Sequence, residues 1–202
     1  MRYERLKELN EVVRKTAKCN DGTSPVINEL RPSQKYLIIS SDPSSETDKS
    51  KDVLDKHSGF EERVISLVFF GSDDNECLEK IRMNYRGYKD RFLDNFYWTH
   101  YSKCYSQGNP DSSWADRFLR EEIELFEPEL IIIFGSKPAD FLFGKGKFKD
   151  RVNTVMEYNG VPTICSLHPS RDWNMFRREE YAFLRTWALI RSKIDSKLIL
   201  HY

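Results

Sequence analysis

The sequence predicts a single three-layer α/β/α domain with a mainly parallel central sheet. Apolar segments of strand length alternate along the chain with segments of helical periodicity, which is the pattern of α/β folds. Every residue at 130–134 is apolar, so this strand is expected at the centre of a sheet covered on both faces. Polar turns at 40–45 and 168–170 each follow an apolar run, which predicts a site at the carboxyl edge of the sheet.

Length and composition favour one globular unit. A chain of 202 residues is long enough for one well-packed domain and short for two, so we expect 1–202 to be one domain. The aromatic fraction of 13% argues against disorder. Lys+Arg and Asp+Glu both number 32, so net charge gives no indication of a polyanionic partner, although basic residues gathered on one face would still bind one.

The chain shows no apolar run of about 18 residues and no signal peptide, so we expect a cytoplasmic protein without a membrane segment. No two of its four cysteines have C-x-x-C spacing, and in such a protein reduced thiols are expected rather than disulfides. These cysteines are Cys19, Cys77, Cys104 and Cys165. The four histidines show no metal-ligand spacing either, so we expect no metal site.

Residues 1–34 are expected to form an N-terminal helix, over about 3–18, and a loop. The core at 35–170 then begins with a strand at 36–39. The polar stretch 46–59 predicts a loop beside the site. Residues 60–70 are apolar enough for a buried strand or a buried helix, and Glu61 and Glu62 favour the helix because acidic residues suit a first turn.

A second helix is expected over about 74–84 and a strand at 96–100. Ser113, with Asp116 three residues later, indicates the start of another helix, which Pro128 ends. A short helix containing Ala139 is expected after the strand at 130–134, followed by a basic loop at 145–149.

The last strand is expected to follow the Asn159-Gly160 turn and to end at His168. A C-terminal helix is expected over 174–195, with its buried residues on one stripe. The stripe contains Phe176, Phe183, Leu184, Trp187, Ile190 and Ile194.

Four segments stand in the order of the motifs of the uracil-DNA glycosylase superfamily. They are LIISSDPSS at 37–45, YWTHYSKC at 97–104 with its continuation to 109, the block at 122–142, and HPS at 168–170. In this order the chain resembles that superfamily over roughly 36–170, most closely its compact bacterial and archaeal branches. The resemblance implies a uracil-DNA glycosylase-like fold and a monofunctional DNA N-glycosylase.

Three departures from the superfamily pattern bear on function. The first motif lacks its glycines, but Asp42 stands where one branch has its catalytic aspartate. His100 replaces the asparagine whose amide recognises uracil. The iron–sulfur branches need four cysteines, and only Cys104 stands clearly at such a position, so we expect neither a cluster nor another cofactor.

By this resemblance Asp42 and His168 are the catalytic residues, acting on the water and on the departing base. His100 and Phe60 are the candidates for base recognition, by hydrogen bonding and by stacking. Contacts to DNA phosphates are expected from two groups of residues. They are Pro43, Ser44, Ser45 and Ser170 beside the two motifs, and Lys145 and Lys147, with Lys149 and Arg151, in the basic loop.

The residue that fills the gap left by a flipped base is Arg171 or Trp173, and the sequence leaves that choice open. The expected partner is DNA, as a duplex with a flipped base or as a single strand, bound by a monomer. Replacing an asparagine amide by imidazole changes the hydrogen bonds offered to a base, so we expect a modified pyrimidine rather than plain uracil. A modified cytosine of phage DNA, and hence a defence role, is the sharpest form of this hypothesis.

Two alternatives stay open at this point. One is ordinary uracil excision in base repair. The other is a catalytically inactive member of the fold that binds DNA or a protein. A nucleotide-processing α/β enzyme is disfavoured because the sequence has no G-x-x-x-x-G-K or G-x-G-x-x-G element.

Overall fold

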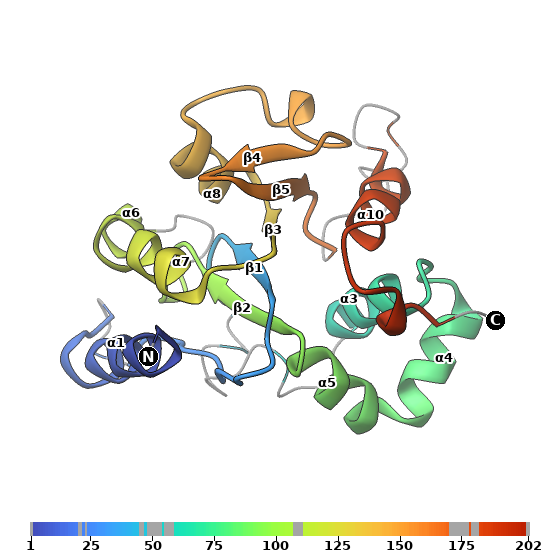
Figure 1. Cartoon of the computed structure of the whole chain (residues 1–202), viewed down its shortest axis with the longest axis horizontal. Coiled ribbons are helices and arrows are strands. Elements are labelled where there is room, and N and C mark those ends of the chain that lie inside the picture. The colour runs from blue at the N-terminus through green and yellow to red at the C-terminus, as the bar shows by residue number, and fades with distance from the viewer. Residues whose placement is uncertain are drawn as a thin grey trace.

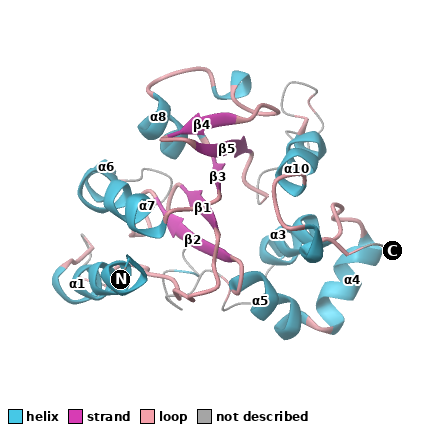
Figure 2. Cartoon of the chain, viewed as in Figure 1, coloured by secondary structure: helices cyan, strands magenta, loops and turns pink. Residues whose placement is uncertain are grey.

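The computed structural model describes residues 2–19, 22, 24–44, 47, 54, 59–106, 111–169, 178 and 182–200. These residues form a five-stranded sheet between two layers of helices (Figures 1 and 2). The strand order is β2-β1-β3-β5-β4. All neighbouring pairs are parallel except β4 and β5, which are antiparallel. The predicted fold class is confirmed.

The strands match the apolar segments of the sequence. They are β1 (Tyr36–Ser40), β2 (Phe96–His100), β3 (Leu130–Phe134), β4 (Met156–Tyr158) and β5 (Val161–Ser166). β3 occupies the middle of the sheet with all five residues buried, as predicted from its uniform apolar character. β5 ends at Ser166 rather than at His168, so His168 lies on the segment that leaves the sheet.

Among the described residues, one group of helices lies on one side of the sheet (Figure 1). They are α3 (Gly59–Phe69), α4 (Asn75–Met83), α5 (Tyr85–Leu93) and α10 (Phe183–Arg191). The helical interpretation of 60–70 is therefore confirmed. α5 was not predicted from the sequence. It begins directly after α4 because the Asn84 side chain caps it and accepts a hydrogen bond from the Gly87 N–H.

Another group of helices lies on the opposite side (Figure 1). It comprises α1 (Arg2–Thr16), α6 (Ser112–Trp114), a π-helical turn η1 (Ala115–Leu119), α7 (Arg120–Phe126) and α8 (Ser136–Phe143). Two short 3₁₀ turns complete the described elements, η2 (Phe148–Asp150) and η3 (Ser196–Leu198). Ser113 does not begin its helix as predicted: Asp111 does, because its side chain accepts a hydrogen bond from the Ser113 N–H.

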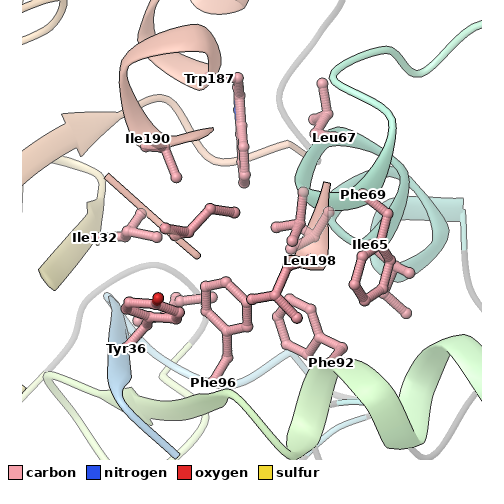
Figure 3. Packing of buried hydrophobic residues seen from close by; sticks show 14 of the residues in the cluster. Tyr36, Ile65, Leu67, Phe69, Phe92, Phe96, Ile132, Trp187, Ile190 and Leu198 are labelled. Carbon is pink, nitrogen blue, oxygen red and sulfur yellow. The ribbon is translucent and has the colours of Figure 1, made fainter. Parts of the chain in front are cut away.

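The core on the α3, α4, α5 and α10 side is rich in aromatic rings (Figure 3). Phe96 packs there against both Tyr36 and Phe92, and its ring is stacked on that of Phe92 at 4.6 Å between ring centroids. Trp187 of α10 is fully buried in the same cluster. Leu184 is 57% exposed, so its predicted place on the buried stripe of this helix is wrong, and Phe176 lies outside the described residues.

The prediction that all cysteines are reduced thiols is wrong. Cys19 and Cys104 form a disulfide across a sequence separation of 85, with Cα atoms 5.7 Å apart. The disulfide joins the segment after α1 to the segment after β2, inside a small apolar cluster that includes Trp114. Sequence spacing could not indicate this pair because the fold alone brings the two segments together.

Within the described ranges, no helix combines the length and the apolar character needed to cross a bilayer.

Candidate active site

Four parallel strands end at the same edge of the sheet, and each leads into a polar segment. Asp42 follows β1, His100 is the last residue of β2, and His168 follows β5. Ser40 of β1 lies opposite His100 in the register of the two strands. β3 separates β1 from β5, so the segments carrying Asp42 and His168 leave the sheet about 10 Å apart, at roughly 4.8 Å per strand. That spacing suits a small ligand held between them.

The segment after β2 continues alongside the segment after β1. The Tyr101 N–H donates to the Ser40 carbonyl at 2.8 Å, and the Ser102 N–H donates to the Ser41 carbonyl at 2.8 Å. Ser106 then reaches the Asp42 side chain, donating to Oδ2 from its hydroxyl at 2.7 Å and from its N–H at 3.3 Å. The Asp42 carboxylate is therefore held by the segment that follows β2.

Gly135, which follows β3, allows the backbone after β3 to lie close to the chain after β1 on one side and to the end of β5 on the other. It adopts φ +94°, and a Cβ at this position would lie 3.2 Å from the Ser41 hydroxyl. Its N–H donates to the Ser166 carbonyl at 3.2 Å. A side chain here would strain the backbone and push against the first motif, so glycine suits this position.

His168 is packed between aromatic rings. Its ring centroid lies 5.2 Å from that of Phe60 on α3 and 5.4 Å from that of Phe134 at the end of β3. The next residue, Pro169, accepts a hydrogen bond through its carbonyl from Arg63 Nη1 at 3.1 Å. The first turns of α3 therefore hold both the histidine ring and the backbone that follows it.

His100 is a buried imidazole without a full set of partners. It is 2% exposed, and its Nδ1 has no hydrogen-bond partner among the described residues. Burial, with smaller effects of the charges on Lys103 and His168, lowers the pKa of His100 well below its usual value. The ring is therefore neutral at pH 7, and a buried nitrogen of this kind is expected to find a partner in a ligand or water.

A buried charged network lies at the end of β2, on the side chains next to His100. Lys103 and Glu122 are 2% exposed each at their side chains, and Lys103 Nζ lies 2.6 Å from Glu122 Oε2. Thr99 donates to both Glu122 oxygens at 3.0 Å, and Tyr97 donates to Oε1 at 2.7 Å. Burial and the nearby Glu122 charge raise the pKa of Tyr97 well above its usual value, so its hydroxyl stays protonated. The network fixes the position of the segment that carries His100.

The network continues into α1, where Asn10 Nδ2 donates to the Tyr97 hydroxyl at 3.1 Å. Neither this network nor the Ser106 contact was found from the sequence. The alternation of Tyr97, Thr99 and Tyr101 on one face of a strand was the only available signal, and it does not distinguish polar from apolar packing.

Comparison with known protein families places the chain in a superfamily. The sequence model of the Uracil DNA glycosylase superfamily matches residues 27–190. The chain belongs to this superfamily. The matched range contains Asp42, His100 and His168, and it leaves out α1 and Cys19. A search of curated proteins found no match.

The cysteines of this superfamily member do not fit a four-cysteine iron–sulfur cluster. Cys19 and Cys104 are bonded to each other, whereas Cys77 and Cys165 are buried on opposite faces of the sheet. In the part of the chain that the structure describes, no three His, Cys, Asp or Glu side chains are grouped so as to hold a metal ion.

The structure describes only some of the remaining candidate residues. Pro43 is buried, and the Ser44 hydroxyl lies 2.9 Å from that of Thr47. Lys145 and Lys147 are exposed on the segment after α8. Four candidates lie outside the described residues. They are Ser45, Ser170, Arg171 and Trp173.

Arg151 departs from the expected basic patch. It is 9% exposed, and its Nη1 donates to Asp140 at 2.8 Å while Nη2 donates to the Gly144 carbonyl. Its guanidinium closes the loop 144–151 and is not available to a phosphate.

Proposed function

We propose that this protein is a DNA glycosylase that hydrolyses the N-glycosidic bond of a flipped-out base and leaves an abasic site. Membership of the Uracil DNA glycosylase superfamily supports the reaction class. The observation that carries the proposal is the combination, at one sheet edge, of the Ser106-held carboxylate of Asp42 with the ring of His168. A module that only binds DNA needs neither group.

The chemistry assigns different tasks to the two groups. Cleavage of the bond passes through a sugar with oxocarbenium character and a base with developing negative charge. Asp42 stabilises the cationic sugar and orients the attacking water, since its carboxylate is fixed by hydrogen bonds. His168 donates a hydrogen bond to the oxygen of the departing base. Water is the nucleophile, so the enzyme is monofunctional and the product is an intact abasic site.

Phe60 and His100 are proposed to recognise the base. Phe60 is only half-buried and its ring lies beside that of His168, so a flipped base that meets His168 can stack on Phe60. The unpartnered Nδ1 of His100 is available for a polar edge of the same base. A buried donor or acceptor left unpaired costs about 1–3 kcal/mol, so this nitrogen discriminates among bases.

The substrate that best suits these recognition residues is a modified pyrimidine. An asparagine amide donates and accepts side by side, which matches the edge of uracil, whereas a neutral imidazole offers one donor and one acceptor on opposite sides of its ring. A hydroxymethylated or glucosylated cytosine of phage DNA is the specific proposal, and it implies a role in defence. The DNA contacts of Ser44, Ser45, Ser170, Lys145 and Lys147, the wedge, the monomeric state and the cytoplasmic location stay predictions.

The test uses purified protein and four labelled DNAs, each as a duplex and as a single strand. They carry uracil, hypoxanthine, 5-hydroxymethylcytosine or glucosylated 5-hydroxymethylcytosine. Abasic sites are revealed by alkali, and Asp42→Asn is the matched control because it keeps the shape of the side chain. Release of one modified cytosine by the wild type, with Asp42→Asn binding the same DNA without release, supports the proposal.

Other outcomes reject parts of it. If the protein releases uracil alone, at a rate typical of uracil excision, the modified-base substrate is rejected in favour of ordinary uracil excision in repair. Binding without release from any of the DNAs, equal in wild type and Asp42→Asn, favours a catalytically inactive binding protein.

A further inference from the structure

Ser106 contacts the carboxylate of Asp42, the proposed catalytic group. It lies 64 residues from Asp42 in sequence, and both residues are partly buried. Its hydroxyl and its N–H both donate to Asp42 Oδ2, at 2.7 and 3.3 Å. Two donors on one oxygen fix the rotation of a carboxylate more firmly than a single donor can, because a turn about the Cβ–Cγ bond breaks both hydrogen bonds.

The two oxygens of Asp42 thereby become different. Among the described residues the hydrogen bonds of Ser106 fall on Oδ2, and Oδ1 receives none. A carboxylate that orients a water needs one oxygen directed at that water and the rest of the group held still. Ser106 supplies the holding contact and leaves Oδ1 for the water.

The segment that carries Ser106 is itself firmly anchored. Tyr101 and Ser102 bond to the backbone of the first motif, and Cys104 is fixed to Cys19 by the disulfide. Lys103 lies between them in its buried ion pair with Glu122, and its carbonyl accepts a hydrogen bond from the Val26 N–H at 2.8 Å. We call residues 101–106 the support segment. Anchoring at successive residues is what positioning of a reactive group requires.

We propose that Ser106 is a positioning residue of the reaction, which orients Asp42 so that Oδ1 meets the attacking water. This inference rests on the proposed function. It gives Ser106 no contact with the base or the sugar, so its removal is expected to lower the rate of the chemical step and to leave DNA binding unchanged.

The first test measures base release in single turnover, with whichever DNA of the panel above the wild type cleaves. Ser106→Ala is expected to lower the single-turnover rate by about 10- to 100-fold, as for a small misplacement of a reacting group, without changing the affinity for DNA. Ser106→Thr keeps the hydroxyl and is expected to restore most of the rate. In an Asp42→Ala background, Ser106→Ala is expected to cause no further loss, because residues that act as a unit are not additive.

A second test needs no turnover and no knowledge of the base. It compares binding to a duplex with a pyrrolidine abasic analogue, which is cationic like the transition state, and to one with neutral tetrahydrofuran at the same position. The wild type is expected to prefer the cationic duplex, Asp42→Ala to lose that preference, and Ser106→Ala to show a reduced one. Ser106→Thr serves as the matched control and is expected to retain it.

The outcomes separate the inference from the proposed function. If Ser106→Ala keeps the wild-type rate and the wild-type cation preference, the inference is overturned and the proposed function stands. The inference is also overturned if Ser106→Ala lowers the rate as much in the Asp42→Ala background as in the wild type, because Ser106 would then contact DNA directly. If the wild type releases no base and shows no cation preference, the proposed function fails and the inference falls with it.

Discussion

Reduction of the Cys19–Cys104 disulfide should cost this protein a large part of its stability. A bridge between residues so far apart removes many conformations from the unfolded chain. For a separation of 85 residues, the chain-entropy relation gives about 4.6 kcal/mol at 25 °C, and measured values are commonly about 2–4 kcal/mol. We therefore expect reduction to lower the free energy of unfolding by about 3–4 kcal/mol, against a total of about 5–15 kcal/mol for a typical domain.

The assay is urea unfolding with and without a phosphine reductant. The dependence of the free energy of unfolding on urea concentration is fitted separately for the oxidised and the reduced protein, because a cross-linked unfolded chain exposes less surface. The double variant Cys19→Ser/Cys104→Ser is the matched control and should be insensitive to reductant. Thiol counting provides an independent check. Burial raises the pKa of Cys77 to about 11 and that of Cys165 to about 12, so both should react slowly in the folded protein.

In urea without reductant, two thiols should react, those of Cys77 and Cys165, and after reduction all four. Four reactive thiols before reduction would show that the disulfide does not form. Two thiols combined with a stability difference below about 1 kcal/mol would refute the entropy argument while keeping the bond.

Two further predictions concern the buried polar groups beside the site. Lys103→Met leaves the Glu122 carboxylate buried without its cation and should lower the free energy of unfolding in urea by about 3–5 kcal/mol. The double variant Lys103→Met/Glu122→Gln should recover much of that loss. A double variant as unstable as Lys103→Met would contradict the ion-pair argument. Since burial, Lys103 and His168 lower the folded-state pKa of His100, the unfolded chain binds a proton near pH 6.5 that the folded protein refuses. The stability contributed by His100 is thus present above about pH 6.5 and is lost as the pH falls toward the lowered pKa. Between pH 7.5 and 5 the wild type should therefore lose more stability than His100→Gln. Parallel curves of the free energy of unfolding against pH for the two proteins would refute this.

Local sequence signals predicted the frame of this fold well. The apolar run at 130–134 became the central strand because only a strand covered on both faces accommodates five buried aliphatic and aromatic residues in succession. Glu61 and Glu62 correctly indicated a helix, although both side chains are buried, with Glu62 paired to Arg82 at 2.8 Å. Two acidic residues at the start of the segment were enough to predict a helix there, because acidic side chains are favourable in a first helical turn.

Signals failed where structure depends on contacts between distant segments. Ser106 and Asp42 lie 64 residues apart, and Lys103 and Glu122 are 19 apart on different elements, so no periodicity connects them. α5 was missed because Gly87 and Asn84 weaken the helical pattern, while the fold uses Asn84 as a cap. The candidate site therefore followed from the resemblance, and its supporting contacts came only from the structure.

The contacts of α1 determine where the N-terminal boundary of an expressed fragment should lie. The superfamily match starts at residue 27, yet Asn10 of α1 completes the buried network around Tyr97, and Cys19 holds the support segment. A clone that began at the boundary of the match would leave the Tyr97 hydroxyl without its donor and would expose apolar surface around Trp114. A stable expressed protein is therefore expected to need α1 and Cys19 in addition to the matched range 27–190.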